Sequence, residues 1–314
     1  MSFLNKFQYH YHDKQIESLV KSKNYKGLFS YLESISDKKK IFHDLSLKNV
    51  SQAINQSSQD ISKNKIVWIN SFLSEDSDYF SLFFEYYLQN FELLKQKITS
   101  YKKAISEILL KAENVDFNTL VNQSYFFQWM ILNNKEKKLY KFISNDLPFF
   151  STENNFNFSK SNLSQSFIFI INHPYRIYQK IKKSNNNDQE IAKNIFLNLD
   201  NQASSEEIGK TNFSISRKGW HVHSQSWLDA NVINSLRGKI ISIKELSKEP
   251  YETLSSVILH LIQSGVKIDL NYDLIENFIK EHPVPKDEAY EDLSNKEIKF
   301  LDKYVNEIMG LYDI

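Results

Sequence analysis

Three short apolar segments, each followed by a helix-like pattern, constrain the fold more than any other feature. They are residues 66–70, 166–171 and 239–243, all rich in Ile, Val and Phe. Apolar runs of this length bounded by polar residues are typical of fully buried parallel strands. An aromatic-rich stretch follows the first segment, and Pro250 after the third stands where the first turn of a helix accepts proline. Strands that alternate with helices predict an α/β domain with a mostly parallel sheet covered on both faces.

The two ends of the chain read as helical. Residues 1–62 are polar with apolar positions at helical spacing, so we expect a helical N-terminal extension at 1–62 and an α/β domain at 63–314. Near the C-terminus, Ser294 and Glu297 form the pattern of a capping box. The apolar face predicted for the helix that follows contains Ile298, Leu301, Val305, Ile308 and Met309.

Composition narrows the class of protein. The 314 residues carry a net charge of +1 and are 25% charged and 41% hydrophobic, which is ordinary for a globular protein and offers no footprint for nucleic acid or a membrane surface. The absence of cysteine excludes disulfides and cysteine metal sites. The N-terminus lacks a signal pattern, and no apolar run approaches a membrane span, so we expect a cytoplasmic protein.

Glycine is scarce in a way that bears on chemistry. At the usual frequency of about 7%, roughly twenty glycines would be expected; there are six, and none lies between Gly27 and Gly209. Loops that wrap phosphates with backbone N–H groups usually need glycine, because larger side chains obstruct the approach. A conventional glycine-rich phosphate loop is therefore excluded from that stretch.

Four motifs, in order, carry a family resemblance. They are IVWINSFLSEDSDYF at 66–80, SFIFIINHPYRIYQK at 166–180, GWHVHSQSW at 219–227 and IISIKELSKEPYETLSSVILHL at 240–261. Together they resemble bacterial PAPS-dependent sulfotransferases related to the cytosolic enzymes, over about residues 65–314. The resemblance implies a P-loop-NTPase-like central parallel sheet flanked by helices, with the N-terminal helical extension added.

The resemblance also implies where the sulfate donor would bind, and the expected residues are missing there. The family holds the 5′-phosphosulfate with a lysine, a glycine and hydroxyl groups, but here Ser74 stands at the lysine position, Asp76 at the glycine position and Asp78 at a hydroxyl position. The degenerate loop comprises Ser71, Ser74, Glu75, Asp76, Ser77 and Asp78. At ~4 Å, two like charges cost about 1 kcal/mol even in water, so these carboxylates should repel the donor.

The positions that correspond to the 3′-phosphate site and the catalytic base have also changed. Asn172 stands at the position of the family's arginine and Lys180 near that of its serine, with Arg176 as a further positive charge. Asn145 stands at the position of the catalytic histidine, and an amide cannot accept a proton from a hydroxyl acceptor. His223 belongs to the Trp220-x-x-His-x-x-x-Trp227 stretch, which implies a place on the acceptor side, although packing between the tryptophans explains it more simply.

Two patterns have a metal-binding interpretation and a simpler one. His221 and His223 could chelate a metal if they lay on a strand, but metal sites need three or four ligands and no cluster completes the pair. The acidic turn Glu75–Asp78 could hold a cation. It is better explained as a helix N-terminus, with Ser77 or Asp78 as the cap. We expect no metal.

Three functional hypotheses follow. The favoured one is a sulfotransferase-like pseudoenzyme that has lost PAPS binding and catalysis and acts as an interaction or scaffold module for an unknown protein partner, with no cofactor. The second is a divergent sulfotransferase that uses PAPS, with Lys180, Arg176 and His223 in new roles and a carbohydrate or small alcohol as acceptor. The third is a binder of a non-phosphorylated small molecule in the same cleft.

Overall fold

The computed structural model describes nine stretches of the chain, and a few residues among the first 22. These stretches are residues 65–91, 94–101, 103–104, 140–147, 164–197, 205–207, 214–216, 219–286 and 293–308. The predicted N-terminal extension at 1–62 lies almost entirely outside the described residues, so its helical character stays a prediction.

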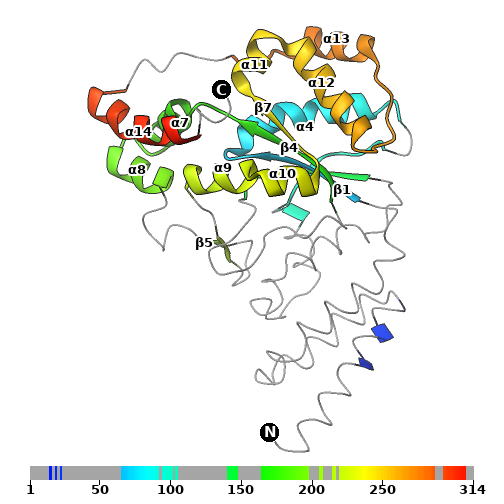
Figure 1. The fold of residues 1–314 in the computed structure, drawn as a ribbon, viewed down its shortest axis with the longest axis horizontal. Helices are drawn as coiled ribbons and strands as arrows, with labels where there is room; N and C mark the ends of the chain where they lie inside the picture. Colours follow the sequence, from blue (N-terminus) through cyan, green and yellow to red (C-terminus); the bar gives the residue numbers. More distant parts are fainter. Residues whose placement is uncertain are drawn as a thin grey trace, which may run out of the picture.

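A five-stranded parallel sheet forms the centre of the molecule (Figure 1). Its order is β2-β3-β1-β4-β7, and every neighbouring pair is parallel. The strands are β1 (Lys65–Ser71), β2 (Thr99–Ser100), β3 (Tyr140–Asn145), β4 (Ser164–Ile171) and β7 (Gly238–Ser242). The α/β arrangement predicted from the three apolar segments is confirmed, because those segments are β1, β4 and β7.

Helices cover both faces of this sheet (Figure 1). Side chains alternate along a strand, so Val67 and Ile69 of β1 point to one face with Ile168 and Ile170 of β4. That face packs against α4 (Ser74–Leu88), α12 (Pro250–Gln263) and α13 (Tyr272–Glu281), with α11 (Ile243–Lys248) following β7 directly. The opposite face packs against α9 (Trp220–Leu228) and α10 (Ala230–Leu236), where the rings of Phe167 and Trp227 lie 5.1 Å apart.

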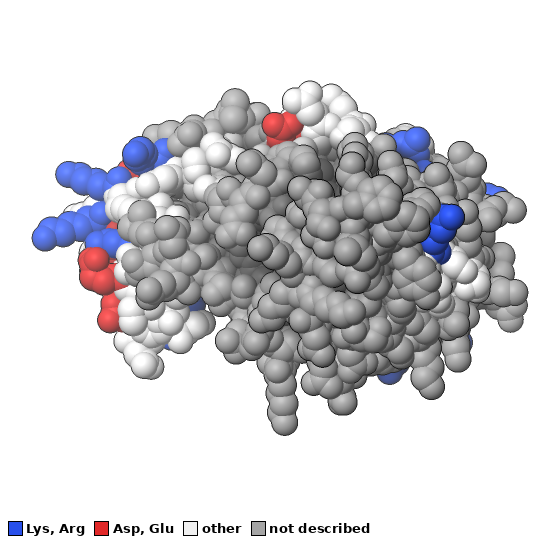
Figure 2. All heavy atoms as spheres, turned by 90° about the horizontal axis from the view of Figure 1, so that it is seen from below, with Lys and Arg blue, Asp and Glu red and all other residues white. Residues whose placement is uncertain are grey.

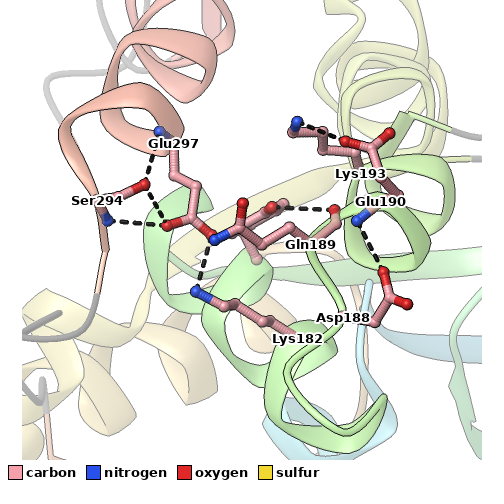
Figure 3. Close-up of polar contacts among 8 residues, drawn as sticks. Lys182, Asp188, Gln189, Glu190, Lys193, Ser294 and Glu297 are labelled. Carbon is pink, nitrogen blue, oxygen red and sulfur yellow. Dashed lines mark hydrogen bonds and ion pairs between the residues drawn. The ribbon is translucent and has the colours of Figure 1, made fainter.

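A third group of helices lies beside the sheet: α7 (Pro174–Ser184), α8 (Gln189–Leu197) and α14 (Asn295–Ile308). The predicted capping box of α14 is present, with Ser294 N donating to Glu297 Oε2 at 2.8 Å and Glu297 N donating to Ser294 Oγ at 3.4 Å. Glu297 is buried and also binds Lys182 Nζ of α7 at 2.8 Å (Figure 3). This ion pair therefore fastens α14 to α7. A small antiparallel pair, β5 (Ser205–Glu207) and β6 (Ser214–Ser216), completes the described elements.

The structure corrects the predicted start of α4, the helix that follows β1. The sequence predicted an acidic turn at Glu75–Asp78 with Ser77 or Asp78 as the cap, but α4 begins at Ser74 and its N-cap is Leu73. The segment from Ser74 onward has no glycine or proline to break a helix, and Glu75 and Asp76 interact favourably with the positive end of the helix dipole. The aromatic-rich stretch belongs to the core, because Phe80, Phe83, Phe84 and Tyr87 of α4 are fully buried.

Two surface properties of the described residues complete the picture. None of their helices is long and apolar enough to cross a membrane. In the view from below, the described residues at one end of the molecule carry both basic and acidic side chains (Figure 2). A mixed surface of this kind agrees with the net charge of +1.

Candidate functional site

The sheet topology points to one place for a site, the carboxyl ends of β1 and β4. From β1 the chain passes through α4 on one face toward β2 and β3, whereas from β4 it passes through α9 and α10 on the other face toward β7. Connections that leave neighbouring strands in opposite directions open a crevice between them, and ligands of open α/β sheets bind there. The predicted site residues Asp76 and Asn172 both lie at this point, Asp76 in the first turn of α4 and Asn172 directly after β4.

The connection from β1 to α4 is short and contains no glycine. Only Phe72 and Leu73 separate Ser71, the end of β1, from Ser74, the start of α4. The N-cap Leu73 offers no side-chain hydrogen bond to the helix, and Ser71 Oγ donates to the Leu73 carbonyl. This connection is therefore not a glycine-rich loop that wraps a phosphate, and the backbone donors at this place are the N–H groups of the first turn of α4.

A carboxylate of the protein itself occupies the start of α4. Asp76 is 7% exposed, and its Oδ1 and Oδ2 accept from Asn172 Nδ2 at 3.1 and 3.3 Å. Asn172 is held in this orientation because its own Oδ1 accepts from His173 N at 2.9 Å. Lys180 Nζ of α7 lies 3.2 Å from Asp76 Oδ1. The two groups predicted at the donor's 3′-phosphate position therefore both bind Asp76.

Lys180 is shared between two carboxylates. Its Nζ also lies 3.1 Å from Glu75 Oε2, and the side chain of Glu75 is 71% exposed. Asp78 is exposed on the same helix, and burial, together with the charges of Glu75 and Asp76, raises its pKa. The Lys180 ammonium thus contacts two carboxylates, and the raised pKa of Asp78 reflects burial first and the like charges of Glu75 and Asp76 second.

Asn145 is tied into a buried hydrogen-bond network at the end of β3. Its Nδ2 donates to Asn70 Oδ1 and to the Leu147 carbonyl, both at 3.1 Å, and its Oδ1 accepts from Leu147 N at 3.2 Å. This network fixes the turn after β3. Asn70 was not among the predicted site residues; it is fully buried, and within the described stretches its Nδ2 has no hydrogen-bond partner. The signal in the sequence that could have identified Asn70 is a polar residue near the end of an otherwise apolar strand.

His223 lies on the α9 side of the sheet, where it is fully buried. Its ring packs against Phe72 and Phe169, with centroids 5.4 and 5.9 Å away. One turn later in α9, Trp227 Nε1 donates to the Leu147 carbonyl at 2.9 Å, the same carbonyl that Asn145 contacts. Asn145 and His223 are therefore both buried residues that pack beneath the carboxyl edge of the sheet.

The remaining predicted residues have different environments. Arg176 is 8% exposed within α7, and Ser77 is 2% exposed, with its carbonyl accepting from Ser81 Oγ at 2.9 Å. The Ser74 side chain lies outside the described part. His221 and His223 lie on the helix α9 rather than on a strand, and residues two apart on a helix do not face each other. Among the described residues no group of three or more His, Cys, Asp or Glu could hold a metal.

Comparison with known proteins gives little beyond the fold. No protein-family model matches the chain, and no curated protein matches it. Among solved structures, the chain is similar to mouse sulfotransferase SULT7A1 complexed with PAP. The identity is 13%, the match covers 79% of this chain and 86% of the mouse protein, and the TM-score is 0.45. A likeness this remote does not assign an activity.

Proposed function

We propose that this chain is a sulfotransferase-like α/β module that does not bind PAPS or transfer sulfate, and that acts as an interaction or scaffold protein. One observation supports this most: the Asp76 carboxylate is bound by Asn172 and Lys180 at the crevice between β1 and β4. The protein thus supplies its own anion at the place where the four sequence motifs would put the anion of the donor.

The energetics disfavour an anionic ligand at this crevice. A phosphate that took the place of the Asp76 carboxylate would have to separate it from Lys180 and Asn172. Leaving a buried charge without its partner costs about 3–5 kcal/mol. A phosphate that left the pair intact would meet Glu75 and Asp76, and each like charge at ~4 Å costs about 4 kcal/mol at an effective dielectric constant of 20. Either route weakens binding by several orders of magnitude.

The enzymatic alternative would need three residues that are engaged elsewhere. Lys180 is bound by two carboxylates, Arg176 is buried within α7, and His223 is enclosed between two phenylalanine rings. A general base must reach the proton that it removes. Asn145, at the base position of the family, is an amide with both ends hydrogen-bonded.

A thermal-shift titration with PAP tests this proposal. Any ligand that binds the folded state alone stabilises it, by ~2.7 kcal/mol at 100 times Kd. We expect that PAP does not bind at the carboxyl edge and so does not raise the unfolding temperature. We also expect no transfer of labelled sulfate from PAPS to a panel of alcohols and sugars. Labelled sulfate in an acceptor would overturn the proposal in favour of the divergent enzyme.

A further inference from the structure

Two tyrosine side chains stack on each other at the surface, where α12 and α13 begin. Tyr251 is the second residue of α12, and Tyr272 is the first residue of α13. The centroids of their rings lie 5.9 Å apart, with 26° between the ring planes. This contact places the first turns of the two helices side by side, in the layer that covers one face of the sheet (Figure 1).

The ring pair is not part of the core. Tyr272 is 51% exposed, which makes it the most exposed large apolar side chain among the described residues, and Tyr251 is partly buried. Ile275 and Phe278, both fully buried, already pack α13 against the core. Tyrosine is enriched in protein–protein interfaces, because its rigid ring supplies contact area together with a polar tip. The exposed ring of this pair therefore suits contact with a partner.

A carboxylate stands next to each ring. Glu252 follows Tyr251 in the first turn of α12, Asp273 follows Tyr272 in the first turn of α13, and both carboxylates are exposed. The N-terminus of a helix corresponds to about half a positive charge, so acidic residues are favoured in a first turn. Two full negative charges nevertheless exceed two half charges of the opposite sign. The surface beside the rings is therefore negative.

The surrounding layer has the same sign of charge. Residues 243–281, from the start of α11 to the end of α13, contain seven acidic residues and four lysines, a net charge of −3, although the whole chain carries +1. One of these lysines, Lys280, is paired with Glu276 at 2.6 Å. Burial raises the pKa of Tyr251, and neighbouring groups raise it further, namely Tyr272, Glu276, Glu252 and Asp273. This shift agrees with a negative potential at the ring pair.

We propose that this surface docks an arginine-bearing segment of a protein partner, and that it is formed by Tyr251, Tyr272, Glu252 and Asp273. A guanidinium group stacks on the face of an aromatic ring and donates from its planar edge to carboxylates, so one arginine can use both features. Charge complementarity selects this occupant, because an acidic or phosphorylated segment would be repelled. The inference rests on the proposed role as an interaction module, but not on the loss of PAPS binding.

Fluorescence anisotropy tests this surface with the full chain and a labelled peptide in which Gly-Ser pairs separate several arginines. In matched peptides, lysine keeps the charge without the planar group, and citrulline keeps the planar group without the charge. Tyr272→Ala removes the exposed ring, and Glu252→Gln/Asp273→Asn removes both charges. Tyr272→Phe keeps the ring. Glu190→Gln is the matched control, because that side chain on α8 is 79% exposed.

We expect saturable binding of the arginine peptide, weaker binding of the lysine peptide and none of the citrulline peptide. Tyr272→Ala and the double charge variant should each weaken binding about threefold, and their combination about tenfold. Tyr272→Phe and Glu190→Gln should bind like the wild type. No saturation, equal binding of the three peptides, or equal affinity in all variants would overturn the surface. Unfolding curves recorded without peptide verify that each variant folds.

Two further comparisons separate this proposal from its neighbours. Light scattering reveals self-association: a dimer that Tyr272→Ala dissociates would assign the ring pair to a second copy of the chain and overturn the proposal. Failure of the peptide to bind would remove the docking surface alone, because the loss of PAPS binding is tested by the PAP titration at the carboxyl edge of the sheet. Binding of PAP would contradict the proposed function and leave the peptide result standing.

Discussion

Lys180 Nζ lies 3.2 Å from Asp76 Oδ1, and the two residues are 104 positions apart in the sequence. This contact joins the first turn of α4 to α7, the helix after β4. Asn172, which precedes α7, also binds Asp76, so the three residues form one arrangement across the carboxyl ends of β1 and β4.

Removal of the Asp76 charge should destabilise the fold much more than removal of the Glu75 charge. Both carboxylates contact Lys180 Nζ at nearly the same distance, but Asp76 is 7% exposed and the Glu75 side chain 71% exposed. We expect Asp76→Asn to lower the free energy of unfolding by about 1–3 kcal/mol and Glu75→Gln by no more than about 0.5 kcal/mol. Urea unfolding of the two variants measures the difference. Equal effects would show that burial of Asp76 does not matter.

The ion pair between Lys182 of α7 and Glu297 of α14 should make the free energy of unfolding depend on pH in the acidic range. Burial alone would raise the pKa of Glu297, but hydrogen bonds from Lys182 and Ser294 outweigh it and the pKa is lowered. The unfolded chain therefore binds the proton more readily, so this stabilisation is present above the ordinary value of 4.5 and is lost as pH falls through the lower folded pKa.

Glu297→Gln should thus cost about 2–3 kcal/mol near neutral pH, and the difference from wild type should shrink below pH 4.5. Chemical unfolding at a series of pH values measures this. Glu190→Gln is the control, because its partner Lys193 is also on α8 and the Glu190 side chain is 79% exposed. A Glu297→Gln effect that does not change with pH would contradict the account.

Gly238 at the start of β7 leaves room for a phenylalanine ring. A Cβ added there would overlap the side chain of Phe167, which is fully buried on the neighbouring strand. We expect Gly238→Ala to destabilise the protein by about 1–3 kcal/mol through overpacking, with partial rescue in Gly238→Ala/Phe167→Leu. Thermal unfolding of the single and double variants measures the coupling. Strictly additive effects would mean that the ring is not the obstacle.

The sequence was sufficient to predict the architecture but not the interior of the site. Residues 66–70, 166–171 and 239–243 are short, mostly apolar runs, a pattern typical of buried parallel strands, and they form β1, β4 and β7. The start of α4 was wrong by several residues, because the hydroxyl and acidic residues from Ser74 to Asp78 suit a turn, a cap or a first helical turn alike.

The contacts of Asp76 could not be predicted, because they depend on how the first turn of α4 and the segment after β4, far apart in the chain, meet at the sheet edge. Local pattern identifies which residues form strands and helices, whereas strand order decides which side chains at their ends face one another.

Restoration of the family's loop residues should not restore donor binding. Ser74→Lys with Asp76→Gly would return a lysine and a glycine, but the connection between β1 and α4 would still consist of Phe72 and Leu73 alone. We expect no saturable PAP binding by this variant in equilibrium dialysis. Micromolar binding would show that the short connection is not the obstacle and that Asp76 alone closes the site.

The most direct measurement of the central claim is calorimetric titration of PAP into the unaltered protein. The account predicts no heat beyond dilution, because Asp76 already occupies Asn172 and Lys180 and the carboxylates beside them repel phosphate. A saturable exothermic isotherm with one site per chain, lost in Lys180→Gln, would contradict it.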